Sequence, residues 1–314
     1  MVEWRNRLRK LELPAALLLL SALWSAHALR PLLLPDAWMP ESAARLTAPL
    51  AALIFVGCAA AVSVRRRAGI VSTGKLAQCL LAGCGFFLLS ALLTTVADTQ
   101  RFALMALVPW LTAVLQPYWS GREHGTKDDL LPALLCLVGM LLLFPFALPR
   151  GAAEWRGALM GGIAIAGLTI AGLAVAGCFV AREQRGHPRA LVLQRMPQQM
   201  AVATLPALWP LALPQSVHAL AGLSAQQTAV LALWMLGVEL PALALLWWLL
   251  ARMRATQAAL RFVLAPVLAA LAARAMTGAS ANLAEWAGAA AVMAGAAWML
   301  LAAPKTDTTT SLFT

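Results

Sequence analysis

A single carboxylate lies within one of the most apolar stretches of the chain, LWMLGVELPALALLWW, from Leu233 to Trp248. Glu239 is the only ionisable residue in this stretch. An ionised acidic group inside a membrane costs about 2.5–3.5 kcal/mol, so acidic residues there usually face a cavity or a partner. Pro241 cannot donate a hydrogen bond to the carbonyl of Gly237, and a free carbonyl beside a carboxyl is typical of a proton or cation site. A neutral Glu239 bonded to a neighbouring helix would explain the same pattern.

The composition indicates a membrane protein throughout. Of the 314 residues, 61% are hydrophobic and 12% are charged, and the mean hydropathy is +0.78. Soluble domains carry about 25% charged residues, so a soluble fold is excluded. A helix needs about 20 mostly apolar residues to cross a bilayer. Ten spans are predicted, at 12–34, 43–64, 76–97, 101–120, 129–148, 156–180, 191–212, 228–251, 256–275 and 282–302.

Two segments of the chain, 103–143 and 258–301, resemble each other. Each has a span with a central proline, a short polar connector, and a second span with a glycine near its middle. The proline and glycine are Pro109 and Gly139 in the first segment, and Pro266 and Gly295 in the second.

Each of these segments ends a set of five predicted spans. An odd number of spans makes the second set enter the membrane from the opposite side, which is the inverted-repeat architecture of secondary transporters. We therefore predict an all-α integral membrane protein with ten transmembrane helices. The first five-helix repeat covers residues 1–150 and the second, inverted repeat covers 151–314.

The basic residues predict the orientation of the chain. Most of the 24 lysines and arginines fall in the connectors on one side of the predicted spans, and this side should be cytoplasmic. Both termini are then cytoplasmic, in a membrane of the bacterial inner-membrane type. The net charge of +11 follows from this bias, so nucleic acid is not an expected partner.

The chain resembles the drug/metabolite transporter superfamily, specifically its EamA-like ten-span members. The segment ALWSAHALR (Ala22–Arg30) is similar to the family pattern in the first span, and Arg45 is similar to the arginine that opens the second. VPWLTAVLQPYWSGRE (Val108–Glu123) resembles the family's proline-to-Gly-Glu connector. The resemblance implies transport of small metabolites, often export, through a cavity between the two halves. Glu239 is not part of the family pattern, so the resemblance implies no particular substrate.

His27 is the second intramembrane residue able to carry a proton. It lies about 22 Å from the predicted inner end of its span, and Glu239 lies about 20 Å from the inner end of its own. At matching depths the two side chains are expected to meet as a pair that responds to pH near neutrality. Trp24 shares a helix face with His27 and is expected to form a stacking wall of the pocket, lipid-facing packing being the alternative.

Other polar and aromatic residues complete the expected site. Trp110 and Trp234 are predicted to line the pocket for substrate or proton. Arg261 lies about 9 Å from the depth of Glu239, so an ion pair between them is not expected. It is predicted to snorkel or to line a basic inner vestibule together with Gln198 and Arg195.

The sequence favours one class of function. Walker-type, H-E-x-x-H and G-x-S-x-G motifs are absent from the sequence, and no selectivity-filter pattern is evident. We therefore predict a secondary active transporter for an amino acid, amine or drug-like molecule, with no cofactor, no metal and no catalytic residue. Protons and membrane lipid are expected partners, and the chain is expected to be a monomer or weak dimer. A flippase for lipid-linked substrates is the alternative, followed by a membrane-embedded enzyme.

Overall fold

The computed structural model describes residues 2–65, 71–93, 98–120, 126–145, 151–180 and 189–301, and these residues form helices and connectors without a strand. In chain order the helices of the first half are α1 (Val2–Leu33), α2 (Glu41–Ala44), α3 (Thr47–Arg65), α4 (Thr73–Leu93), α5 (Asp98–Met105), α6 (Leu107–Ser120) and α7 (Thr126–Leu143). Those of the second half are α8 (Ala152–Val180), α9 (Arg189–Thr204), η2 (Leu205–Ala212), α10 (Pro214–Ala221), α11 (Ala225–Trp234), η3 (Met235–Glu239), α12 (Leu240–Leu250), α13 (Ala255–Ala259), α14 (Arg261–Thr277) and α15 (Leu283–Leu301).

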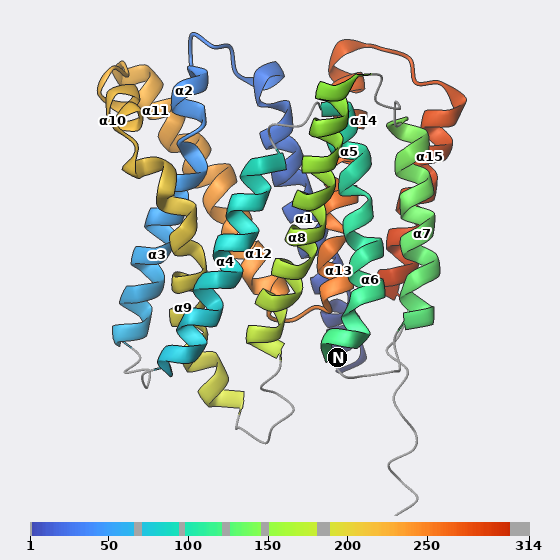
Figure 1. Cartoon of the computed structure of the whole chain (residues 1–314), viewed down its shortest axis with the longest axis horizontal. Helices are drawn as coiled ribbons and strands as arrows, with labels where there is room; N and C mark the ends of the chain where they lie inside the picture. The colour runs from blue at the N-terminus through green and yellow to red at the C-terminus, as the bar shows by residue number, and fades with distance from the viewer. Residues whose placement is uncertain are drawn as a thin grey trace, which may run out of the picture.

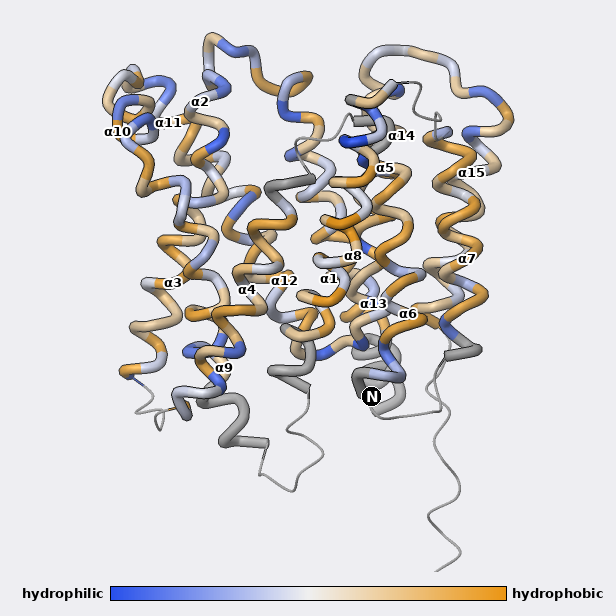
Figure 2. The backbone as a smooth tube through the Cα atoms, in the orientation of Figure 1, coloured by the Kyte–Doolittle hydropathy of each residue, from blue (hydrophilic) through white to orange (hydrophobic). Residues whose placement is uncertain are grey.

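Within the described residues, seven helical stretches are long and apolar enough to cross a membrane, and the number is eight if one bent pair counts as a span. Hydrophobic residues run along the helices and hydrophilic residues gather toward the two ends of the bundle (Figure 2). The chain is therefore a helical membrane protein. The seven stretches are Leu11–Leu33, Glu41–Arg65, Thr73–Ser90, Glu154–Ala174, Ala225–Leu250, Ala255–Thr277 and Leu283–Leu301.

All ten predicted segments fall on helices, but three of them are not single long helices. The segment 101–120 is divided because Pro109 has no N–H for the carbonyl of Met105, where α5 ends. The segment 129–148 holds a shorter apolar helix, Asp129–Leu143. The segment 191–212 continues into α10 through a 74° bend, where Leu213 is extended before Pro214. The count of ten spans stays a prediction.

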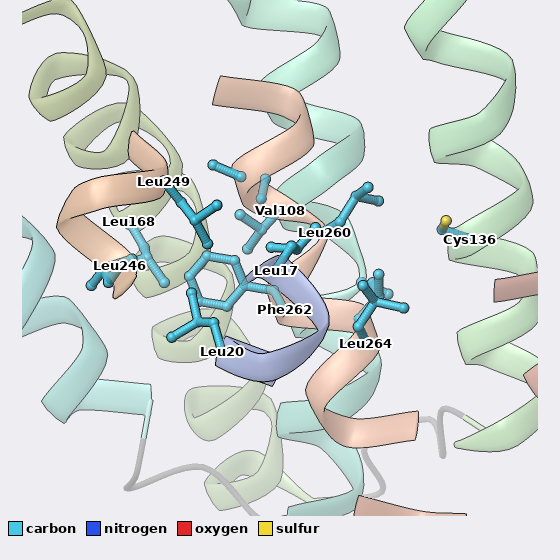
Figure 3. Close-up of a cluster of buried hydrophobic side chains, with 14 of the residues drawn as sticks. Leu17, Leu20, Val108, Cys136, Leu168, Leu246, Leu249, Leu260, Phe262 and Leu264 are labelled. Atoms are coloured by element: carbon cyan, nitrogen blue, oxygen red, sulfur yellow. The ribbon is translucent and has the colours of Figure 1, made fainter. Parts of the chain in front are cut away.

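The helices pack as one bundle (Figure 1). α1 lies against α14 and α12, α4 lies against α8, and α3 lies against α9 and η2. Their buried faces form a common apolar cluster, in which the ring of Phe262 on α14 lies among leucines such as Leu20 of α1 and Leu249 of α12 (Figure 3). Residues far apart in the sequence therefore meet around α1.

The contact between α7 and α15 depends on glycines. A Cβ atom on Gly139 would lie 2.6 Å from the carbonyl oxygen of Gly288, and a Cβ on Gly288 would lie equally close to the carbonyl oxygen of Gly139, at 2.6 Å. A Cβ on Gly295 would lie 2.7 Å from Cys136 Sγ. Small residues let membrane helices approach closely where lipid offers no hydrophobic drive for association. The two mid-helix glycines noted in the sequence, Gly139 and Gly295, thus belong to one helix interface.

Candidate functional site

Glu239 ends a single π-helical turn, η3, between α11 and α12. The N–H of Leu240 bonds the carbonyl of Met235 five residues back, and the next residue, Pro241, has no N–H to offer. Isolated π turns occur frequently at functional sites, because they change which side chains face one another. Here the wider turn allows the indole N–H of Trp234 to reach the carboxylate of Glu239, five residues later, at 3.3 Å.

Three helical segments of the bundle supply hydrogen bonds to this carboxylate. His27 Nδ1 on α1 lies 2.8 Å from Glu239 Oε1, and Thr47 Oγ1 on α3 donates to the same oxygen at 3.1 Å. With Trp234, all three bonds from the described residues converge on Oε1, so Oε2 stays available to a proton or a ligand. The Glu239 side chain is 13% exposed, whereas that of His27 is 49% exposed. The predicted contact between His27 and Glu239 is confirmed.

Thr47 was not foreseen from the sequence. Its hydroxyl also lies 2.9 Å from the carbonyl oxygen of Ala44, one turn back on its own chain. One hydroxyl proton serves both acceptors, so Thr47 donates either to Glu239 or to Ala44 at any one time. A threonine at the start of a predicted helix usually bonds its own backbone. No signal in the sequence separated Thr47 from that ordinary role.

The two remaining predicted tryptophans, Trp24 and Trp110, lie elsewhere. The ring of Trp24 packs edge-on against Phe262, with ring centroids 5.8 Å apart, and lies 5.4 Å from the guanidinium of Arg261. Trp24 is partly buried against the apolar cluster, and its lipid-facing alternative stays untested. Trp110 on α6 packs against the buried apolar cluster. Their predicted role in binding a substrate stays a prediction.

The expectation that Arg261 snorkels is wrong. Its side chain turns inward at the start of α14 and the residue is only 3% exposed, with three aromatic rings around its guanidinium. No described carboxylate forms an ion pair with it, in agreement with the expected separation from Glu239. Gln198 is half-buried on α9, which packs against α3 and α4. The side chain of Arg195 lies outside the described part of the chain, so the vestibule as a group stays a prediction.

A second polar cluster joins the two halves at the end of the bundle where α1 begins (Figure 1). Asp129 of α7 is buried and accepts hydrogen bonds from Arg254 Nη1 at 3.0 Å and from Thr256 Oγ1 at 3.0 Å. The backbone N–H of Thr256 donates to Gln116 Oε1 of α6 at 3.3 Å. The sequence signal was available, since Asp129 and Arg254 carry opposite charges at the same predicted side of the membrane.

Replacing Asp129 with alanine is expected to lower the free energy of unfolding by about 1.5–3 kcal/mol, because Arg254 and Thr256 lose a shared buried acceptor. Unfolding of the purified protein in mixed micelles with added sodium dodecyl sulfate measures this change. The control is Glu12→Ala, since Glu12 and Arg252 are about half exposed and 3.6 Å apart, where a pair contributes at most about 1 kcal/mol. Equal losses in the two variants would contradict a buried cluster.

Comparison with known proteins identifies the fold and not the function. No protein-family model matches the sequence, and no curated protein matches it. Thirteen chains of solved structures are similar to it. One of them, described only as "Crystal structure of protein", is 18% identical and has a TM-score of 0.61 over 93% of this chain and 99% of that chain. At this identity the similarity shows a shared helical fold along nearly the whole length of both chains.

Proposed function

We propose that the protein is a secondary active transporter of the EamA-like type, moving a small organic metabolite by alternating access. The observation that carries the proposal is the Glu239 carboxylate, held inside an apolar bundle by donors from α1, α3 and α11. These helices come from both halves of the chain, so a movement of one half against the other changes the surroundings of the carboxylate. A buried acid whose partners separate during such a movement is suited to coupling proton and substrate.

The pairing of helices supports two inverted five-helix repeats. The first predicted span of each half packs on the third and fourth predicted spans of the other half. In the first case α1 packs on α12 and α14, and in the second case α8 packs on α4 and α6. Like elements also meet, as α3 with α9, α7 with α15, and α6 with α13. A twofold axis that exchanges the halves requires the first, reciprocal kind of pairing and brings like elements together where they lie near the axis. We therefore keep the ten-span, two-repeat arrangement as part of the proposal.

Proton binding at this site uses only the groups already present. His27 Nδ1 donates to Oε1 of an ionised Glu239 at 2.8 Å, and a proton that binds Oε2 leaves this hydrogen bond in place. Thr47 can donate to Oε1 in either state, or turn its hydroxyl proton to the carbonyl of Ala44. A proton can thus arrive and leave without a large rearrangement of the pocket.

Reconstitution into proteoliposomes tests the proposal. Amino acids, amines, sugars and organic acids are screened for uptake with and without a pH gradient, against liposomes that lack the protein. We expect saturable counterflow of at least one solute and stimulation by the gradient. If no solute exceeds the protein-free background while labelled lipid is flipped, the flippase is the correct function instead.

The proposal includes an inner-membrane location with both termini cytoplasmic. A fluorescent protein that matures only in the cytoplasm is expected to become bright when fused to either end, and alkaline phosphatase fused there is expected to stay inactive. If one end gives a bright fluorescent fusion and the other end gives an active phosphatase fusion, the number of spans must be odd.

A further inference from the structure

Polar contacts tie the two halves of the chain together at the end of the bundle where α1 begins (Figure 1). Asp129 of the first half is 3% exposed and accepts hydrogen bonds from Arg254 Nη1 and Thr256 Oγ1 of the second half, both at 3.0 Å. The backbone N–H of Thr256 donates to Gln116 Oε1 of the first half at 3.3 Å. A guanidinium that donates to a carboxylate forms a charge-assisted bond, about twice as strong as a neutral one. We call this group the latch, and its residues are Gln116, Asp129, Arg254 and Thr256.

The opposite end of the bundle is held differently. The ion pairs described there each lie within one half of the chain, Arg45 with Glu41 in the first half and Arg274 with Glu285 in the second. An exposed hydrogen bond from Gln227 to the carbonyl of Ala37, at 3.1 Å, crosses between the halves. Buried charges therefore join the halves at the latch, whereas the contacts at the other end are on the surface or within one half.

Burial along two helices of the second half shows which end is closed. The buried residues of α14 all fall between Arg261 and Ala269, in the half of the helix nearer the latch. Likewise α12 has several buried residues between Ala242 and Leu250, whereas η3, on the side away from the latch, has none. A helix that is buried all round has neighbours on every side. The bundle thus encloses α12 and α14 near the latch and leaves the rest of these spans partly uncovered.

Glu239 lies at the boundary between the enclosed and the uncovered part. It is the last residue of η3, and α12 continues from it toward the latch. The Glu239 side chain is 13% exposed and that of His27 beside it is 49% exposed. Because the helices on the latch side are enclosed, a proton or solute reaches Glu239 from the opposite end in this structure.

A layer of side chains around Arg261 closes the interior between Glu239 and the latch. The guanidinium lies 4.5 Å from the ring centroid of Phe262, 5.4 Å from that of Trp24 on α1 and 5.6 Å from that of Phe86 on α4, so the layer joins both halves. Trp24 precedes His27 by three residues and so lies about 4.5 Å nearer the latch. The cavity beside Arg261 measures about 20 Å³, which is room for about one water. A solute cannot pass this layer while it is closed.

We propose that the latch is a gate, closed in this structure, and that separation of Asp129 from Arg254 opens this end of the bundle toward Glu239. The inference rests on the transport function proposed above and adds the contact that controls access to its site. In the orientation proposed above the latch faces the cytoplasm, so this structure is the state open to the other side.

Labelling of a buried thiol tests the gate without requiring transport. The variant Thr112→Cys places a thiol beside Arg261, about 6 Å along α6 from Gln116, where the native residue is 3% exposed. The Thr112 hydroxyl donates to the carbonyl of Val108, so its replacement removes a hydrogen bond within one helix. A charged methanethiosulfonate reagent is added to the purified protein in lipid nanodiscs, and mass spectrometry of the digest separates this thiol from the native cysteines. We expect slow labelling, and a rate equal to that of protein unfolded in sodium dodecyl sulfate would overturn the closed gate.

Opening of the latch is expected to expose this thiol. Asp129→Asn, combined with Thr112→Cys, should label about ten- to a hundred-fold faster, because the hydrogen bonds to a charged group are lost. Thr256→Val removes a single donor to Asp129 and should give a smaller increase, and it decides the outcome if Asp129→Asn does not fold. An unchanged rate in the folded variant would overturn the gate.

Two controls separate a gate from a general loss of stability. Gly139→Ala crowds α15 from the same helix as Asp129 without touching the latch, so it should leave the labelling rate unchanged. Glu12→Gln removes a half-exposed pair with Arg252, 3.6 Å apart, and should also leave the rate unchanged. Equal acceleration in Gly139→Ala and Asp129→Asn would mean that lowered stability exposes the thiol, and the gate would be refuted.

The gate and the transporter can fail separately. Faster labelling in Asp129→Asn, without transport of any solute by the native protein, refutes the transporter alone. Transport of a solute, with a labelling rate that ignores the latch, refutes the gate alone.

Discussion

The variant Glu239→Gln is expected to lose proton-driven transport by about ten- to a hundred-fold while folding like the native chain. The amide oxygen of glutamine can still accept hydrogen bonds from Thr47 and Trp234, so the packing around η3 is kept. Glutamine can neither bind a proton nor hold a negative charge opposite His27. A hydrogen bond to a charged group contributes about 1.5–3 kcal/mol, and each 1.4 kcal/mol changes an equilibrium tenfold. Uptake into proteoliposomes with an imposed pH gradient measures the loss.

Glu41→Gln is the matched control for this variant. Glu41 lies in α2 with its side chain 67% exposed, and its partner Arg45 is on the surface as well. Its replacement should leave transport unchanged, because water screens this pair and no other helix depends on it. Counterflow that is unaffected in both Glu239→Gln and His27→Ala would remove these two residues from the mechanism. Uptake that ignores the pH gradient in the native protein would remove proton coupling alone.

The variant Gly139→Ala is expected to lower the free energy of unfolding by about 1–3 kcal/mol, a typical cost of overpacking. Its new methyl group would lie 2.6 Å from the Gly288 carbonyl oxygen and 2.8 Å from the Val292 nitrogen. Both are backbone atoms, which cannot turn aside as a side chain does, so α7 and α15 must separate. Thermal unfolding in detergent measures the change, at about 2–4 °C for each kcal/mol in chains of 150–250 residues.

Gly57→Ala in α3 makes the same chemical change without the clash. A Cβ at Gly57 meets no heavy atom within 4 Å. Alanine is favoured over glycine within a helix by about 0.5–1 kcal/mol, so this variant should be neutral or slightly more stable. Matching losses in the two variants would mean that helix propensity, and not the contact between α7 and α15, determines the effect.

Hydropathy and the regular rise of a helix made several features predictable. A run of apolar residues can satisfy its backbone in lipid only as a helix, so the described parts of all ten predicted segments lie mainly on helices. Counting residues from the charged ends gave the depths of His27 and Glu239, and these depths predicted their contact. The missing N–H of Pro241 indicated a disturbed helix beside the carboxyl. The same property of Pro109 explains the break that was not predicted between α5 and α6.

The sequence by itself therefore determined which segments form apolar helices and how deep His27 and Glu239 lie in them. Only the tertiary structure decided which way each side chain faces and what it meets. Arg261 turns inward because rings from α1 and α4 meet there, and Thr47 faces Glu239 because α3 packs beside η3. The position of a residue around the helix axis matters only relative to neighbouring helices. Those neighbours come from distant parts of the chain, and no single segment contains that information.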